Sequence, residues 1–217
     1  MIDHIKTVIF DWDGTLHESM HIYEKAFRKA FQYLVDKGYA EQKTFTAKDI
    51  SLFLGKNPQE MWQTILPNTK DIHIQEASQL ISEEMLKSIK HHEAKLYPHA
   101  EEVLTYLKEK GYKLVYLSNS KNYYMEAMRQ AFKLDRYFDL YLTSEMYQYI
   151  PKKMILNQVL SSLEAPMVMI GDRDIDIETG IYNAILTIGC LYGYGLENEL
   201  KDADYLIEDL LSLKRIL

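Results

Sequence analysis

Residues 8–16 carry the feature that most constrains the fold, a short apolar run that stops at two closely spaced carboxylates. The run Val8-Ile9-Phe10 is β-branched and aromatic, which predicts a buried strand. Asp11 and Asp13 follow it, and Gly14 allows a sharp backbone turn with amide groups that can face an anion. Open α/β sheets bind ligands at the carboxyl ends of their strands, so Asp11 is predicted to lie at a site.

An Asp-Gly pair also closes many hairpins, which would require a second strand directly after the turn. The sequence instead has apolar side chains at helical spacing between residues 18 and 37, at Tyr23, Ala26, Phe27, Ala30, Phe31 and Leu34. A helix after the turn disfavours the hairpin.

The rest of the chain separates into a helical part and an alternating part. Residues 16–96 show helical patterns and no convincing strand, with a turn at Gly55, Lys56 and Asn57-Pro58. From Tyr97 onward, strands are predicted over 113–117, 140–143, 167–170 and 184–188, with helices between them from Pro98, around Met125 and over 155–163, and a strand edge and helix over 206–217.

This alternation predicts an α/β fold, a three-layer Rossmann-like core with a parallel sheet and an inserted α-helical cap. The core is predicted to comprise residues 1–15 and 97–217, and the cap residues 16–96.

Composition limits the partners and the compartment. The chain has 217 residues and a net charge of -7, so neither nucleic acid nor an anionic membrane surface is an expected partner. Cys190 is the single cysteine, which permits no internal disulfide, and no apolar run resembles a signal peptide or could span a bilayer. A cytoplasmic protein is therefore expected.

Polar side chains follow two later strands. Ser118-Asn119-Ser120 follows residues 113–117, where it can cap the next helix, cradle a phosphate, or do both. Asp172, Asp174 and Asp176 follow residues 167–170. Their alternation suggests an EF-hand loop, but Ile177 and Asn183 occupy the positions that need Gly and Glu, so this reading is rejected.

Four motifs in this order resemble those of the haloacid-dehalogenase-like (HAD) hydrolases, in particular the phosphoglycolate phosphatase and β-phosphoglucomutase-like group with a helical cap. Asp11-x-Asp13-Gly14-Thr15-Leu16 resembles the first motif. Ser118 stands at the second, and Gly171-Asp172-x-x-x-Asp176 resembles the fourth.

The third motif of that family is a lysine that offsets carboxylate and phosphate charge. Lys152 and Lys153 are both candidates, although adjacent lysines before a helix are most often solvated surface. Many members write this motif Lys-Pro-x-Pro, which this chain does not. The phasing with the next helix favours Lys152.

The resemblance implies an enzyme, a phosphatase that hydrolyses a small phosphate monoester through an aspartyl-phosphate. It makes Asp11 the nucleophile and Asp13 the general acid and base, with Ser118 and Lys152 as the other catalytic residues. An acid/base at Asp13 argues against the dehalogenases of the family. A phosphomutase of the β-phosphoglucomutase type and a non-catalytic phosphate-binding regulatory protein remain alternatives.

Clustered carboxylates repel one another and stay ionised only beside a cation, for which Mg²⁺ is the expected cofactor. The metal ligands are assigned to the carboxylates of Asp11 and Asp172 and the carbonyl of Asp13, with Asp176 securing the site.

Further residues are assigned to the substrate, a small phosphorylated metabolite. Ser118, Asn119, Lys152 and backbone amides near Trp12 are expected to hold its phosphoryl oxygens. Gly55 and Lys56 could reach an anionic group from the cap, although an ordinary helix–helix connection is favoured there. The expected state is a monomer or a homodimer.

Overall fold

The computed structural model describes residues 4–55 and 58–217. The chain divides into two compact units, a core unit formed by Met1–Glu18 and Leu96–Leu217 and a helical unit formed by Ser19–Lys95. The helical unit is inserted into the sequence of the core unit between its first and second strands.

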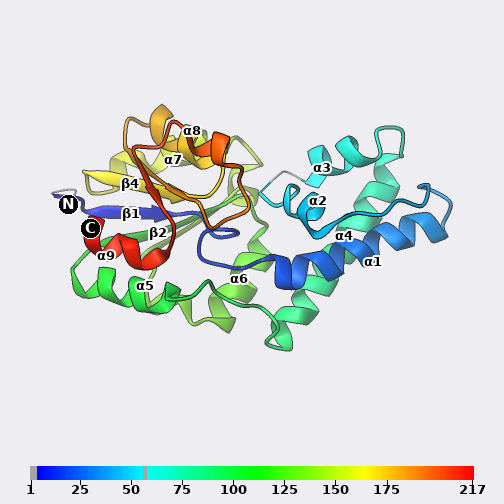
Figure 1. The fold of residues 1–217 in the computed structure, drawn as a ribbon, viewed down its shortest axis with the longest axis horizontal. Coiled ribbons are helices and arrows are strands. Elements are labelled where there is room, and N and C mark those ends of the chain that lie inside the picture. Colours follow the sequence, from blue (N-terminus) through cyan, green and yellow to red (C-terminus); the bar gives the residue numbers. More distant parts are fainter. Residues whose placement is uncertain (1–3, 56–57) are drawn as a thin grey trace. The chain divides into compact units, whose positions relative to one another are not determined.

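The core unit is built on a sheet of six strands (Figure 1). In the order in which they lie, these are β3 (Leu140–Thr143), β2 (Lys113–Ser118), β1 (Thr7–Phe10), β4 (Met167–Gly171), β5 (Leu186–Cys190) and β6 (Tyr205–Ile207). Each neighbouring pair is parallel. The predicted α/β fold with a parallel sheet is confirmed.

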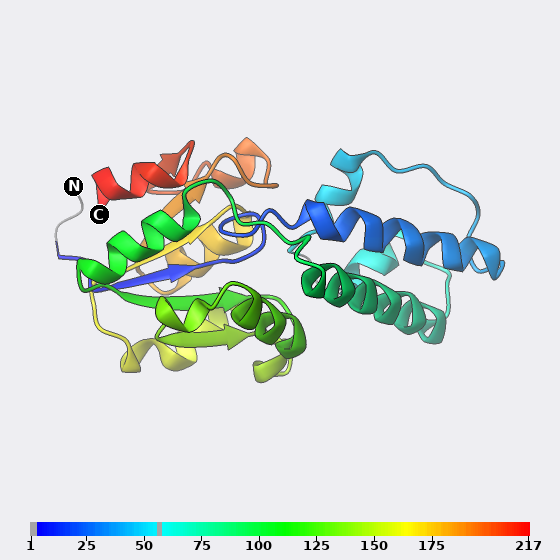
Figure 2. The ribbon, with the colours of Figure 1, turned by 90° about the horizontal axis from the view of Figure 1, so that it is seen from below.

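Helices cover both faces of this sheet (Figure 2). One face carries α5 (Ala100–Glu109), α6 (Asn122–Ala131) and α9 (Leu213–Ile216), and the other carries α7 (Lys152–Val159) and α8 (Asp174–Tyr182). Short 3-10 helices complete the unit at Leu134–Arg136, Glu145–Tyr147, Leu160–Ser162, Glu197–Leu200 and Leu210–Ser212.

Three predicted boundaries shift for local reasons. The helix predicted to open at Pro98 begins at Ala100, because His99 has a φ of +67° and cannot belong to an α-helix. The strand predicted from Ala184 begins at Leu186, because Ala184 has a φ of +53° in the turn after α8. The helix predicted through Leu163 ends at Val159 and continues as the 3-10 turn.

The core of this unit lies where α7 packs on the sheet. β1 is completely buried, as its uninterrupted apolar run predicts for a central parallel strand. Side chains of β1, β2, β3, β4 and α7 form one buried cluster: Ile9, Val115, Leu117, Leu142, Ile155, Leu156, Met167 and Met169. The strand order reverses at β1, so a crevice is expected at its carboxyl end.

The helical unit contains α1 (Met20–Asp36), α2 (Ala47–Ser51), α3 (Pro58–Ile65) and α4 (Asp71–Lys90). α1 packs against α4, and its buried face includes the six apolar positions from Tyr23 to Leu34 that the sequence predicts. The Phe27 ring lies at the centre, with ring centroids 5.2 Å from Phe45, 5.5 Å from Phe53 and 5.8 Å from Trp62. This aromatic packing gives the helical unit a core of its own.

Backbone contacts join the two segments of the core unit on either side of the inserted helical unit. The Tyr97 amide donates to the Leu16 carbonyl at 2.9 Å, and His17 forms an antiparallel bridge with Leu96. These contacts keep residues 16–18 in the core unit, whereas the cap is predicted over 16–96. None of the helices that the structure describes is long and apolar enough to cross a membrane.

Candidate active site

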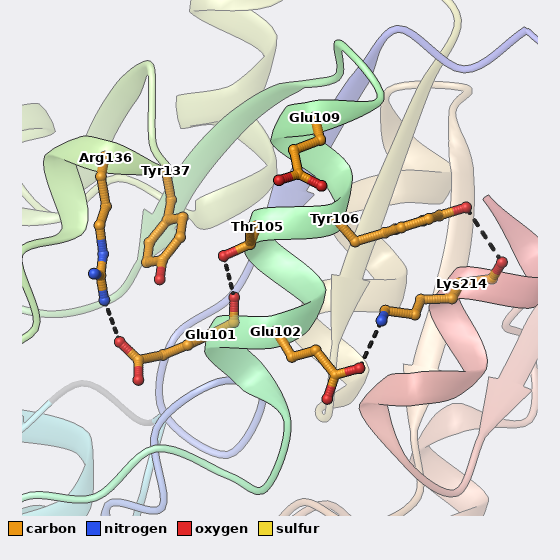
Figure 3. A pocket seen from close by; sticks show the side chains of 8 residues that line it. All are labelled: Glu101, Glu102, Thr105, Tyr106, Glu109, Arg136, Tyr137 and Lys214. Atoms are coloured by element: carbon orange, nitrogen blue, oxygen red, sulfur yellow. Dashed lines mark hydrogen bonds and ion pairs between the residues drawn. The ribbon is translucent and has the colours of Figure 1, made fainter.

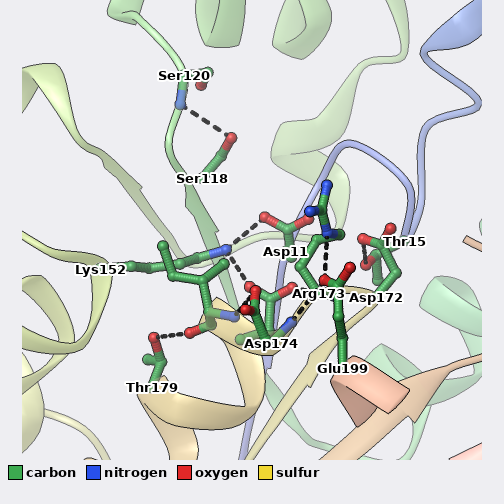
Figure 4. A network of polar contacts seen from close by, with 12 residues as sticks. Asp11, Thr15, Ser118, Ser120, Lys152, Asp172, Arg173, Asp174, Thr179 and Glu199 are labelled. Atoms are coloured by element: carbon green, nitrogen blue, oxygen red, sulfur yellow. Dashed lines mark hydrogen bonds and ion pairs between the residues drawn. The ribbon is translucent and has the colours of Figure 1, made fainter. Parts of the chain in front are cut away.

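The candidate site forms at the carboxyl ends of three adjacent strands (Figure 4). Asp11 follows β1, Asp172 follows β4, and Ser118 is the last residue of β2. Because β1 lies between β2 and β4 in parallel register, these side chains share one edge of the sheet.

Lys152 connects the first and fourth motifs. Its Nζ donates to Asp11 Oδ1 at 2.5 Å and to Asp176 Oδ1 at 2.6 Å. Lys152 is the first residue of α7 and is 1% exposed. Lys153 forms an ion pair with Glu178, and these two side chains are 29% and 58% exposed. The geometry places one of the two candidate lysines among the carboxylates and the other at the surface.

Asp176 is fixed by the start of α8. Its Oδ2 accepts from the Arg173 amide at 3.1 Å, which satisfies one of the donors that a helix leaves open at its amino end. Gly171 makes room for this arrangement, because a Cβ there would lie 2.2 Å from the Asp176 carboxylate. The fourth motif therefore needs its glycine for steric reasons.

The loop 192–195, which follows β5, packs onto Asp172. The Tyr194 amide donates to Asp172 Oδ2 at 2.7 Å, and Thr15 Oγ1 donates to Oδ1 at 3.2 Å. A Cβ on Gly193 would lie 2.2 Å from the Asp172 Cβ, so only glycine allows this approach. No sequence pattern indicated that the Tyr194 amide and Thr15 would be partners of Asp172.

The electrostatics of the cluster favour protonation of its carboxylates. Burial raises the pKa of Asp11 well above its usual range, and Asp176 and Asp172 raise it further, while Lys152 opposes them. Burial and the Asp176 charge raise the pKa of Asp172 to about 7, against the lowering effects of the Tyr194 amide, Arg173 and Thr15. The site holds more negative charge than Lys152 alone can offset.

This donor set fits a hard divalent cation. Carboxylate oxygens of Asp11, Asp172 and Asp176 lie within 4.8 Å of one another, and all three residues are buried. Oxygen donors with excess negative charge are what Mg²⁺ prefers in proteins. A Cβ on Gly14 would lie 2.3 Å from Asp172 Oδ2, so the backbone turn leaves the space that the carboxylate occupies. The residues therefore fit the cation that clustered carboxylates predict.

Asp13 points to different partners. Its Oδ1 accepts from the Tyr124 hydroxyl at 2.6 Å and lies 3.0 Å from His17 Nδ1. A helix around Met125 is predicted from the sequence, but no pattern marks Tyr124, which lies 111 positions from Asp13. Gly14, expected to offer its amide to an anion, donates it to the His17 carbonyl at 3.0 Å instead.

The remaining assigned residues are placed as follows. Ser118 is buried and its Oγ accepts from the Ser120 amide at 3.2 Å, with Asn119 half-buried beside it. Trp12 is 0% exposed, so its indole ring does not reach a substrate. Gly55 is exposed in the helical unit with a φ of +80°, and Lys56 lies outside the described residues.

A concavity of about 430 Å³ lies elsewhere in the core unit, between α5, the turn at 134–136 and α9 (Figure 3). Four of its charged side chains form ion pairs, Arg136 with Glu101 and Lys214 with Glu102. It shares no lining residue with the carboxylate cluster.

Comparison with known proteins identifies the family of this chain. The sequence profile of the haloacid dehalogenase-like hydrolases matches residues 8–189, and the chain belongs to this family. The match confirms the family predicted from the four motifs, and with it the predicted class of enzyme, a phosphoric monoester hydrolase.

The individual proteins that this chain resembles have low sequence identity to it. The chain is 27% identical to a phosphoglycolate phosphatase of Neisseria gonorrhoeae, over 89% of this chain and 83% of that protein. It is 28% identical to the pyrophosphatase PpaX of Listeria monocytogenes, over 99% of both chains. The crystal structure of a predicted phosphatase from Clostridium acetobutylicum superposes with a TM-score of 0.82 at 25% identity, over 98% of each chain.

Proposed function

We propose that this protein is a Mg²⁺-dependent phosphatase that hydrolyses a small-molecule phosphate monoester through an aspartyl-phosphate on Asp11. The observation that carries the proposal is the contact of Asp11 with Lys152 within the carboxylate cluster, at the strand where the sheet order reverses. A nucleophilic carboxylate needs a fixed position. Lys152 holds the Asp11 carboxylate in place through a hydrogen bond of 2.5 Å from Nζ to Oδ1.

The first chemical step uses Asp11 and Asp13. An Asp11 carboxylate oxygen forms a bond to phosphorus as the ester P–O bond breaks, and the leaving oxygen takes a proton from Asp13. In the second step water attacks the phosphorus of the aspartyl-phosphate and gives its proton to Asp13, which restores both carboxyl groups and releases phosphate.

Charge on the transferring phosphoryl group is stabilised by neighbouring donors. The Lys152 ammonium, the Ser118 hydroxyl, the Asn119 amide and backbone amides near Trp12 are proposed to hold its oxygens. Asp11, Asp172 and the Asp13 carbonyl would hold Mg²⁺, with Asp176 securing the site through Lys152. When bound, Mg²⁺ supplies positive charge that offsets both the carboxylates and the phosphate.

The substrate is proposed to be a small phosphorylated metabolite. The two groups of relatives carry different names, a phosphoglycolate phosphatase and a pyrophosphatase. Phosphoglycolate is therefore a candidate within the proposed monoester class, and pyrophosphate, a phosphoric anhydride, is the competing candidate outside it. The helical unit leaves the core directly after Glu18, close in sequence to the reacting residues, which supports a role for it in selecting the substrate.

The test is hydrolysis of a panel of phosphorylated metabolites, including phosphoglycolate and pyrophosphate, with Mg²⁺ and with EDTA. Asp11→Asn should abolish phosphate release, because a neutral amide does not attack phosphorus. The matched control is Asp174→Asn, which changes an exposed carboxylate in the same part of the core unit. Phosphate release by Asp11→Asn at the wild-type rate would reject Asp11 as nucleophile.

The same assay separates the alternatives. A phosphomutase would return an isomer of the substrate with little free phosphate, and a regulatory protein would bind phosphate esters without turnover. Release of stoichiometric phosphate from one metabolite is the outcome expected here.

A further inference from the structure

One oxygen of Asp13 is held by two side chains that the four motifs do not include. The Tyr124 hydroxyl donates to Asp13 Oδ1 at 2.6 Å, and His17 Nδ1 lies 3.0 Å from the same oxygen. Tyr124 Oη and His17 Nδ1 are themselves 3.1 Å apart. The three groups therefore form a closed cluster on a single carboxylate oxygen.

The hydrogen-bonding capacity of these groups fixes their arrangement. A tyrosine hydroxyl has one proton, and the short contact assigns it to Asp13. The Tyr124 oxygen can then only accept from His17, so His17 Nδ1 carries a hydrogen, and Asp13 Oδ1 and Tyr124 Oη share it. The carboxylate oxygen thus receives two donors, one from each ring.

Packing holds both donors in place. His17 is 0% exposed and stacks on Trp12 with a centroid distance of 5.7 Å and an interplanar angle of 12°. Its amide donates to the Trp12 carbonyl at 2.9 Å, which ties it to the loop that carries Asp13. Tyr124 is 5% exposed in the first turn of α6 and meets the His17 ring edge-on, with a centroid distance of 6.3 Å.

Asp13 is left accessible by this arrangement. Its side chain keeps 17% of its surface exposed, whereas His17 keeps 0%. The side chain therefore combines an oxygen held by buried donors with a carboxyl group that can still meet a substrate. The Asp13 carboxyl group is thus held in one orientation and remains open to solvent.

We propose that Tyr124 and His17 are positioning residues that aim the Asp13 carboxyl group at the leaving oxygen of the substrate. This rests on the proposed function, in which Asp13 gives a proton to the leaving oxygen and later takes one from water. Tyr124 and His17 keep their own protons throughout. They therefore affect the orientation of the Asp13 carboxyl group and do not add or remove a proton in either step. Proton transfer is efficient only within hydrogen-bonding reach of the accepting atom, so a loosened Asp13 would transfer more slowly.

If Tyr124 and His17 position Asp13, the rate lost on removing them should depend on the leaving group of the substrate. An ester with a good leaving group, such as 2,4-dinitrophenyl phosphate, needs no proton as its P–O bond breaks. An alkyl phosphate does need one. Loss of Asp13 positioning should therefore slow aspartyl-phosphate formation from the alkyl ester selectively.

The experiment measures single-turnover rates with enzyme in excess for both esters, in wild type and in Tyr124→Phe. This substitution removes one oxygen and keeps the buried ring. We expect the rate to fall by ~10-fold or more for the alkyl ester and to stay within about 2-fold for the dinitrophenyl ester, since general acid catalysis contributes roughly 10²–10⁴-fold in total. Tyr123→Phe is the matched control, because this neighbouring tyrosine on α6 is 36% exposed, and it should leave both rates unchanged.

Two further variants distinguish positioning from folding. His17→Asn can place an amide N–H near the position of Nδ1 and should retain more alkyl-ester activity than His17→Leu. In an Asp13→Asn background, Tyr124→Phe should cause no additional loss, because residues that act through one group are not additive.

The outcomes are separable. If wild type turns over neither these esters nor any metabolite of the panel, the proposed function fails and this inference falls with it. If wild type is active but Tyr124→Phe slows both esters equally, slows neither, or adds its loss to that of Asp13→Asn, the positioning role alone is refuted.

Discussion

Lys152→Met gives the sharpest test of how this site is held together. The substitution keeps a long apolar stem in a position that is 1% exposed and removes only the charge. Asp11 and Asp176 would lose their donors at 2.5 and 2.6 Å while their side chains stay 11% and 1% exposed.

The magnitude follows from burial. Removing one partner of a buried ion pair typically costs about 3–5 kcal/mol, because it leaves an uncompensated charge. Lys153→Met is the matched control, since its ion pair with Glu178 is exposed and such pairs contribute about 0–1 kcal/mol. Two adjacent lysines should therefore differ by roughly 2–5 kcal/mol in their effect on the free energy of unfolding.

The assay is urea unfolding in EDTA followed by tryptophan fluorescence. The chain has two tryptophans, Trp12 in the core unit and Trp62 in the helical unit, so a Trp62→Phe background makes the signal report on the core. Adding Asp11→Asn to Lys152→Met should restore part of the lost stability, because it removes one of the unpaired charges. The reasoning is refuted if Lys152→Met destabilises the core no more than Lys153→Met does.

Further predictions concern the metal and the carboxylates. Because burial and Asp176 raise the pKa of Asp172 to about 7, above the ordinary 3.8, the metal-free folded protein binds more protons than the unfolded chain. Its free energy of unfolding should therefore fall as pH rises from about 4 to about 7, by an amount on the order of a few kcal/mol, and the difference between wild type and Asp172→Asn in urea titrations isolates this contribution. Mg²⁺ should raise the melting temperature of wild type and do so much less in Asp172→Asn; an equal rise in both would place the ion elsewhere. Gly193→Ala should raise the Mg²⁺ concentration needed for half-maximal activity, because its Cβ would lie 2.2 Å from the Asp172 Cβ, and an unchanged Mg²⁺ dependence would show that the loop can move away.

Local patterns were sufficient for the order and type of the core elements. An apolar β-branched run predicts β1 because it must be buried on both faces, and helical spacing predicts α1 because its stripe must face a core. Element boundaries at His99 and Ala184 differed from the predicted ones, since no sequence pattern marks a positive φ in a residue other than glycine.

The four motifs were enough to predict the family. The acidic site could also be predicted, because parallel strands bring their carboxyl ends, and so Asp11 and Asp172, to one edge of the sheet. The phasing with the next helix favoured Lys152, but only the tertiary structure put its ammonium group beside Asp11 and paired Lys153 with Glu178, since consecutive helical residues point about 100° apart. Only the tertiary structure brought Tyr124 to Asp13, across 111 positions, because that contact depends on how α6 packs after β2 and not on any local pattern.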